Sequence, residues 1–255
     1  MEEKREYTRL ASSTTPALII YLLDVSASMV QPLGDRRRVD IVTDALDMIV
    51  KQMIFRSTKG GMIMPRYRVA LFAYSDHVYD LLGGVKGVDE LIEYGIPELS
   101  PMLTTETAQA FLEAEKCLIE ELPRLEECPA PLVCHLTDGE YTGEDPGPVA
   151  RRIMEMGVPD GNVLVENIFI SDNILEAEIG DTKLWPGIRP DTALASDYAR
   201  KLRHISSQAP QSYRMIMHEY GFNLSQDALM LFPGTTSELV AMGFQMSAAT
   251  PVSRS

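Results

Sequence analysis

Two short segments carry oxygen-bearing side chains from which a metal site could be built. Asp24, Ser26 and Ser28 follow an apolar run in a D-x-S-x-S pattern, and Asp138 follows a second apolar run in the sequence LTDGE. If both runs are strands of a parallel sheet, their carboxyl ends lie at one edge, where such sheets form their binding crevices. We therefore expect these four side chains to converge.

A third segment supplies a hydroxyl group to the same edge. Thr104 and Thr105 stand at the start of a predicted helix between the two segments. Hydroxyl and carboxylate oxygens are ligands that Mg²⁺ and Mn²⁺ prefer, and neither a thiolate nor an imidazole is needed. Mg²⁺ takes six oxygens and usually keeps several waters, so two serines, a threonine and two aspartates leave room for an outside ligand.

The elements that would position these residues are short apolar runs typical of strands buried on both faces. A shorter run, 77–81, follows its predecessor after only two residues, which predicts a hairpin and one antiparallel edge strand. The runs predicted as buried strands are Ala17–Leu23, Tyr67–Tyr74, Pro131–Leu136, Val163–Ile170 and Ala228–Phe232.

Helical patterns fill the intervals between these strands. Apolar residues recur at helical spacing within 42–53 and 108–122, Asp145-Pro146 marks a third helix start, and Thr235 with Glu238 forms a capping-box pattern before the last helix. Strand and helix alternate along the chain. This predicts a doubly wound α/β fold with a mostly parallel six-stranded sheet and helices on both faces.

The pattern also predicts the domain organisation. We expect residues 1–15 to form a flexible N-terminal segment and 16–250 to form a single domain. Residues 172–227 are longer than one crossover needs, and we interpret them as an insertion with an extended loop and two helical patterns, 194–205 and 212–220.

Composition excludes several classes of protein. The chain has 255 residues and a formal net charge of −14, which argues against a nucleic-acid partner and against an anionic membrane surface. Three cysteines without metal-ligand spacing favour neither a zinc site nor a disulfide framework. The first ten residues lack the apolar segment of a signal peptide, and no apolar run is long enough to span a bilayer, so we expect a cytoplasmic location.

The combination of these segments resembles the von Willebrand factor A (vWA) family and its metal-ion-dependent adhesion site (MIDAS). Asp24, Ser26 and Ser28 match the D-x-S-x-S motif, Asp138 matches the second aspartate, and Thr105 matches the threonine, with Thr104 as the alternative. The resemblance covers residues 17–171 and resumes at 228–248. The glycine pair that often precedes the family's threonine is absent, because SPML stands there.

The resemblance implies a Rossmann-like vWA fold that binds a protein partner through Mg²⁺ or Mn²⁺, with the partner supplying an acidic oxygen ligand. Such a protein would act as an adaptor or assembly factor. Its partner would come from an AAA+ ATPase or a kinase/phosphatase module, as for cytosolic members of the family.

Two residues outside the metal motif are candidates for partner binding. Trp185 lies in the long loop after the fifth strand, and Glu140 follows Asp138 at the expected site edge. Each has a structural alternative: Trp185 could anchor its loop on the core, and Glu140 could belong to a solvated face. Likewise Asp24, Ser26 and Ser28 could serve only as turn and capping residues.

No common enzyme signature occurs in the chain, and we predict that the protein is not an enzyme. One alternative is a metal-dependent hydrolase in which the ion activates water and Glu140 is the general base. The other is a scaffold in which the metal site is purely structural.

Overall fold

The computed structural model describes residues 6–95, 99, 106–171 and 174–253. Within these residues a central seven-stranded sheet has the order β13-β12-β9-β1-β6-β7, and β8 also pairs with β6. Its strands are β1 (Ala17–Asp24), β6 (Tyr67–Tyr74), β7 (Val78–Asp80), β8 (Lys86–Gly87), β9 (Leu132–Thr137), β12 (Leu164–Phe169) and β13 (Leu231–Pro233).

The sheet is mostly parallel. The pairs from β13 through β12, β9 and β1 to β6 are all parallel, whereas β7 and β8 run antiparallel to β6. The predicted doubly wound sheet with its antiparallel edge strand is therefore confirmed. The additional strand β8 has only two residues and no apolar pattern, so nothing in the sequence marked it.

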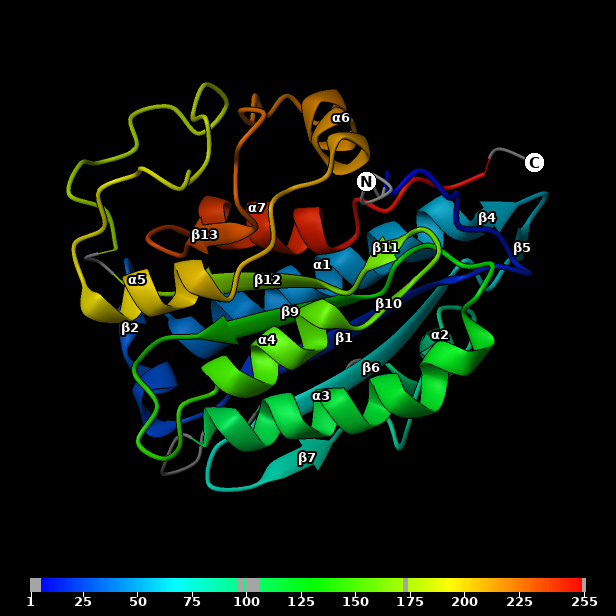
Figure 1. Ribbon diagram of the computed structural model, residues 1–255, viewed down its shortest axis with the longest axis horizontal. Helices are drawn as coiled ribbons and strands as arrows, with labels where there is room; N and C mark the ends of the chain where they lie inside the picture. Colours follow the sequence, from blue (N-terminus) through cyan, green and yellow to red (C-terminus); the bar gives the residue numbers. More distant parts are fainter. Residues whose placement is uncertain (1–5, 96–98, 100–105, 172–173, 254–255) are drawn as a thin grey trace.

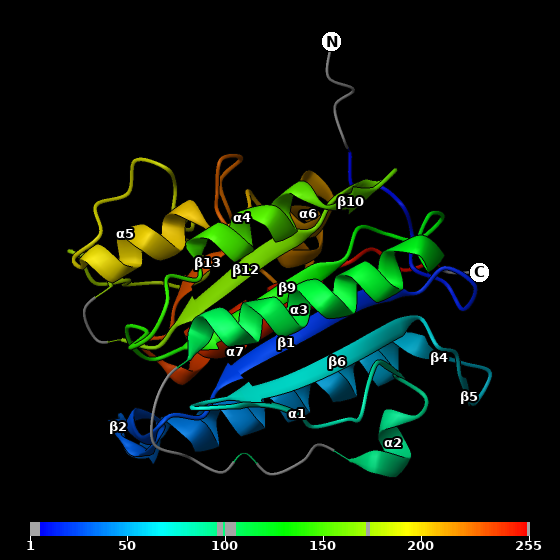
Figure 2. The same ribbon diagram turned by 60° about the horizontal axis from the view of Figure 1, so that its bottom comes forward.

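Helices cover both faces of this sheet (Figure 1). Figure 2 shows α3, α4 and α5 together on one face, while α1 and α7 lie behind the sheet. The helices are α1 (Arg38–Ser57), α2 (Leu91–Tyr94), α3 (Thr107–Glu121), α4 (Gly147–Glu155), α5 (Asp197–His204), α6 (Gln211–Glu219) and α7 (Ser237–Ser247). None of the helices in the described ranges is both long and apolar enough to cross a membrane.

Short elements connect these layers. Two 3-10 turns, η1 (Ala27–Val30) and η2 (Leu122–Arg124), follow β1 and α3. The two-residue strands form three hairpins: β2 (Pro32–Leu33) with β3 (Arg36–Arg37), β4 (Thr58–Lys59) with β5 (Met62–Ile63), and β10 (Gly157–Val158) with β11 (Gly161–Asn162).

Burial of β1 on both faces explains its unbroken apolar sequence. Ile19 and Tyr21 belong to the core between the sheet and helices α1 and α7. Leu18 and Ile20 belong to the core between the sheet and helices α3 and α4. Successive side chains of a strand point to opposite faces, so a strand covered on both faces must be apolar at every position.

Two predicted helix starts are shifted by one residue. The cap of α7 is Thr236 rather than Thr235, since its hydroxyl accepts a hydrogen bond from the backbone N–H of Leu239. Helix α4 begins at Gly147, and the carboxylate of Asp145 accepts that residue's N–H. The two threonines before α7 have equal capping ability and cannot be told apart by pattern alone. Helix ends such as that of α4 commonly vary by one residue.

A row of buried polar side chains crosses the sheet on the α3 face. The ring of His135 on β9 is within 2.7 Å of the hydroxyl of Tyr74 on β6 and within 2.8 Å of Oδ1 of Asn167 on β12. The Asn167 amide nitrogen donates to the carbonyl of Ile205 and to Ser206. Asn167 therefore presents an acceptor to His135, which places the ring proton on Nδ1 and leaves Nε2 to accept from Tyr74.

Glu166 is a second buried polar group, on the opposite face of β12. It pairs with Cys134 of β9 in the sheet register, and both its carboxylate oxygens lack a hydrogen-bond partner of normal geometry. Burial raises the pKa of Glu166 well above its ordinary value, and a weak interaction with the Cys134 thiol opposes this only in part. Burial therefore favours the neutral form of the carboxyl group.

The described part of the N-terminal segment lies against the domain. The Asp160 carboxylate accepts hydrogen bonds from the backbone N–H groups of Thr8 and Arg9 through one oxygen and from that of Ala130 through the other. Ala11 is fully buried and forms a bridge to Val252 near the end of the described chain.

Candidate functional site

The site begins where β1 ends. Asp24, the last residue of β1, is fully buried, and its Oδ1 accepts the backbone N–H of Ser26 at 2.8 Å. Ser26 has extended backbone angles and precedes η1. This carboxylate-to-backbone bond fixes the tight turn that carries Ser26 and Ser28 over the end of the strand.

The second strand end meets the first through Ser28. The Ser28 hydroxyl lies 2.9 Å from that of Ser26 and donates to Oδ1 of Asp138 at 2.7 Å. Asp138 follows directly on β9, the parallel neighbour of β1. The structure thus brings together four of the sequence-predicted residues, Asp24, Ser26, Ser28 and Asp138.

Thr137, which the sequence reasoning did not single out, links the two strands from below. Its hydroxyl donates to Oδ2 of Asp24 at 2.9 Å. Burial raises the pKa of Asp24 to about 6, hydrogen bonds from Ser26 and Thr137 oppose the shift, and the nearby Asp138 carboxylate adds to it. Asp24 is therefore a buried acid whose anionic form is costly unless a cation lies beside it.

Arg38 is the second residue that the sequence reasoning missed. This first residue of α1 donates from Nη1 to Oδ2 of Asp138 at 2.9 Å. The sequence offered a weak signal, because a helix N-terminus disfavours cations and an arginine there is stabilised by an anionic partner. The ion pairs of the described residues include Asp138 but not Asp24.

The predicted threonine ligand cannot be placed. Thr105 and its alternative Thr104 both lie outside the described residues. The next residue, Glu106, donates its backbone N–H to the carbonyl of Ser75, just after β6. Helix α3 then begins at Thr107, which is buried.

The two predicted partner-binding residues lie in separate loops. Glu140 is exposed in the loop after β9. Trp185 is half-buried and packs its ring edge-on against Phe232 of β13, with 6.4 Å between ring centroids. Trp185 thus contacts the core with part of its ring and remains partly exposed.

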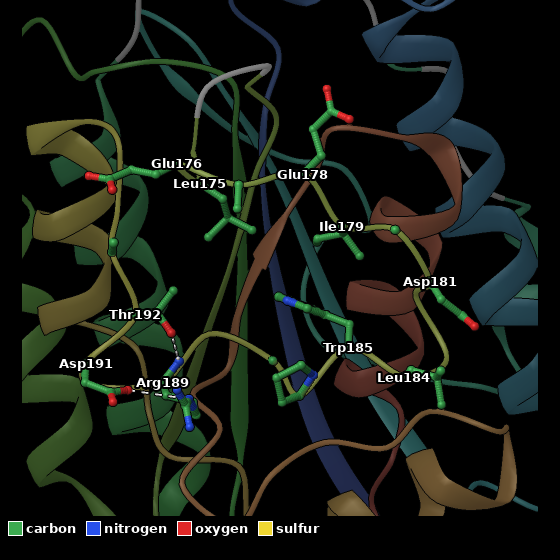
Figure 3. A pocket seen from close by; sticks show the side chains of 15 residues that line it. Leu175, Glu176, Glu178, Ile179, Asp181, Leu184, Trp185, Arg189, Asp191 and Thr192 are labelled. Carbon is green, nitrogen blue, oxygen red and sulfur yellow. Dashed lines mark hydrogen bonds and ion pairs between the residues drawn. The ribbon is translucent and has the colours of Figure 1, made fainter.

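Trp185 also lines a cavity of about 720 Å³ formed by the loop between β12 and α5 (Figure 3). Leu184 beside it is 71% exposed, and Arg189 forms an ion pair with Asp191 on the far wall. The acidic side chains that line the cavity are Glu176, Glu178, Asp181 and Asp191.

The donor set suits a hard divalent cation. Ser28 donates its proton to Asp138 and accepts that of Ser26, which leaves one lone pair of its oxygen free to bind a cation. Asp24 is a buried carboxylate without an ion-pair partner among the described residues, so a cation beside it would be stabilising. The described residues contain no group of three or more His, Cys, Asp and Glu able to hold a metal.

Solved structures share this fold at low sequence identity. A structure of proximal thread matrix protein 1 from the mussel byssus is 15% identical, with a TM-score of 0.52 over 94% of this chain and 48% of that one. A mutant of the PilB minor pilin from Streptococcus sanguinis is 13% identical, with a TM-score of 0.52 over 90% of this chain and 60% of that one. The SpRpn10 VWA domain is 14% identical, with a TM-score of 0.49 over 89% of this chain and 93% of that one.

Sequence comparison adds no relative. No protein-family model matches the chain, and no curated protein matches it. The chain spans 37% to 48% of the length of the mussel protein structures it matches, one of which is described as having a zinc-occupied MIDAS motif. These likenesses establish the doubly wound α/β architecture that the chain and the two superposed structures have in common.

Proposed function

We propose that this protein is of the vWA type and binds a protein partner through a Mg²⁺ or Mn²⁺ ion at a MIDAS. Asp24, Ser26, Ser28, Asp138 and Thr105 would hold the ion. A carboxylate or another anionic oxygen from the partner would complete its coordination. A bound ion would supply a Lewis-acidic position that an oxygen ligand from the partner could fill.

The observation that carries this proposal is the Ser28–Asp138 hydrogen bond. It joins the end of β1 to the end of β9 and places two hydroxyls and two carboxylates in one continuous hydrogen-bonded cluster. If Asp24 and Ser26 were turn residues only, neither Ser28 nor the second strand would need to take part. The fully buried Asp24, without an ion-pair partner among the described residues, adds to this argument.

Contacts around the ion would select the partner. Glu140 is exposed close to Asp138 in sequence, and Trp185 borders a cavity with acidic side chains on its wall. We propose that these two residues contact the partner at the rim. The exposed, acidic cavity wall favours a partner that brings basic side chains next to its acidic ligand.

The proposed role is that of a cytoplasmic adaptor or assembly factor rather than an enzyme. A protein of an AAA+ ATPase or kinase/phosphatase module is the partner class that the family resemblance suggests. Support from the chain itself is its acidic charge, −14, which disfavours nucleic-acid and anionic-membrane partners.

Affinity capture from the native host tests the proposal. Tagged wild type and the Ser26→Ala/Ser28→Ala double variant are each used in Mg²⁺ and in chelator. Asp35→Asn is the control, because Asp35 is an exposed carboxylate between Ser28 and Arg38 in the sequence. We expect a partner retained by the wild type and the control only in Mg²⁺, and lost by the double variant.

Two outcomes would contradict the proposal and favour a different function. A partner retained in every sample would place the interface away from the metal and favour a scaffold. Mg²⁺-dependent turnover of phosphoesters that Glu140→Gln abolishes would favour a hydrolase instead.

A further inference from the structure

The Arg38–Asp138 ion pair is sequestered from water. The side chain of Arg38 is 11% exposed and that of Asp138 is fully buried, and the two are joined at 2.9 Å. The Nε of Arg38 is buried and has no hydrogen-bond partner. An arginine in such a position is expensive to desolvate, and Asp138 is the carboxylate that compensates its charge.

The neighbouring arginines behave differently. Arg36 pairs with Asp44 and Arg37 with Asp40, and all four side chains of these pairs are at least 36% exposed. These are ordinary surface ion pairs of small energetic value. Of the three consecutive arginines, only Arg38 turns inward, although a helix N-terminus disfavours a positive charge there.

Arg38 and the candidate cation ligands share one carboxylate. Ser28 donates to Oδ1 of Asp138, and Arg38 donates to Oδ2 of the same group. A divalent cation held by Ser28 would therefore lie close to a fixed positive charge. Like charges at such separations repel, and water screens them poorly on the side of the cluster where the Arg38 and Asp138 side chains are largely buried.

We propose that Arg38 is a resident cation of the site that competes with the divalent ion for Asp138 and thereby weakens the binding of that ion. The inference rests on the metal site of the proposed function. Its consequence is that the site loads only when free divalent cation is abundant, and that Arg38 keeps Asp138 in position until then.

Calorimetric titration of MgCl₂ and MnCl₂ tests the inference. We compare wild type, Arg38→Gln and the matched control Arg37→Gln, which changes the net charge equally at an adjacent exposed position. Arg38→Gln is expected to tighten Mg²⁺ binding by about tenfold or more, and Arg37→Gln to change it by less than about twofold. Equal or weaker binding by Arg38→Gln would overturn the inference.

Two further measurements separate charge from structure. Arg38→Lys keeps the charge and should bind Mg²⁺ about as weakly as wild type, so Lys and Gln variants of equal affinity would refute competition by charge. If Arg38→Gln does not fold alone, circular dichroism should show Mg²⁺ restoring its fold, because the cation then replaces the guanidinium; no restoration counts against the inference.

The design also distinguishes this inference from the proposed function. A wild type that binds neither ion argues against the metal-dependent function. Binding gained by Arg38→Gln would still show that the guanidinium excludes the ion. If both proteins fail to bind, both proposals fail.

Discussion

His135 makes the stability of this protein depend on pH in a way that one substitution can isolate. Its ring is fully buried, sits against Phe111, and is bonded to Tyr74 and Asn167. Burial lowers the pKa of His135 from its ordinary value of 6.5 to about 4, and the hydrogen bond to Asn167 opposes the shift. Between pH 4 and 6.5 the unfolded chain therefore binds a proton at His135 that the folded chain does not.

The sign and size of the effect follow from that difference. Because the unfolded state takes up the extra proton, the contribution of neutral His135 is complete above pH 6.5 and is lost as the pH falls towards 4. With these two pKa values, the free energy of unfolding loses about 2 kcal/mol from His135 between pH 7 and pH 5. Burial raises the pKa values of Asp24 and Glu166, so these two groups increase the free energy of unfolding as the pH falls. Their contribution is the same in wild type and in any His135 variant.

Urea unfolding at pH 7 and pH 5, without divalent cations, measures this contribution. Trp185 is the single tryptophan and reports the transition by fluorescence, with circular dichroism as the second probe. On going from pH 7 to pH 5, His135→Gln should lose about 2 kcal/mol less stability than wild type. His77→Gln is the control, because the His77 side chain is 75% exposed, and it should keep the wild-type change.

Only the change with pH is compared, so the general cost of altering the core does not enter. If His135→Gln and wild type change equally between the two pH values, then His135 is not held neutral by its surroundings. The reasoning from burial would then be refuted.

Three further predictions concern other buried or site carboxylates. Glu166→Gln should become progressively more stable than wild type from pH 5 to pH 8 in urea unfolding, since the wild type must keep its carboxyl group protonated; a constant difference would contradict this. Asp160→Ala should lower stability by about 1–3 kcal/mol and speed proteolysis near the N-terminus, because three backbone donors lose their acceptor; intact protection would refute the role of that carboxylate. Mg²⁺ at about 100 times its Kd should raise the melting temperature of wild type and Asp35→Asn by roughly 5–10 °C, and Asp24→Asn should erase the rise; an equal rise in all three would remove the site.

The strands and their shared edge could be predicted because the physical signals are local. A run such as Ala17–Asp24 is apolar at every position, which only a strand covered on both faces requires. The motif residues follow the carboxyl ends of such strands, and the carboxyl ends of parallel strands lie at one edge of the sheet. This is why Asp24, Ser26, Ser28 and Asp138 could be expected near one another.

What could not be predicted depends on long-range packing. No local pattern shows that β9 rather than β12 lies beside β1. Thr137 on β9 bonds to Asp24 at the end of β1, and Arg38 on α1 bonds to Asp138 after β9. Both contacts join segments that are far apart in the sequence. The sequence shows three consecutive arginines, but not which of them turns inward.

The polar row through His135 has a further consequence for how the strands find their alignment. Strands that are apolar on both faces can slide by one residue with little change in buried apolar surface, so burial alone distinguishes such alignments poorly. In this sheet a one-residue shift of β9 would move His135 to the α1 face. The hydroxyl of Tyr74 and the side-chain oxygen of Asn167 would then each lose a hydrogen bond, and each buried group left unpaired would cost about 1–3 kcal/mol of stability. The row therefore favours the one alignment of β9 in which Asp138 lies beside Ser28 at the end of β1.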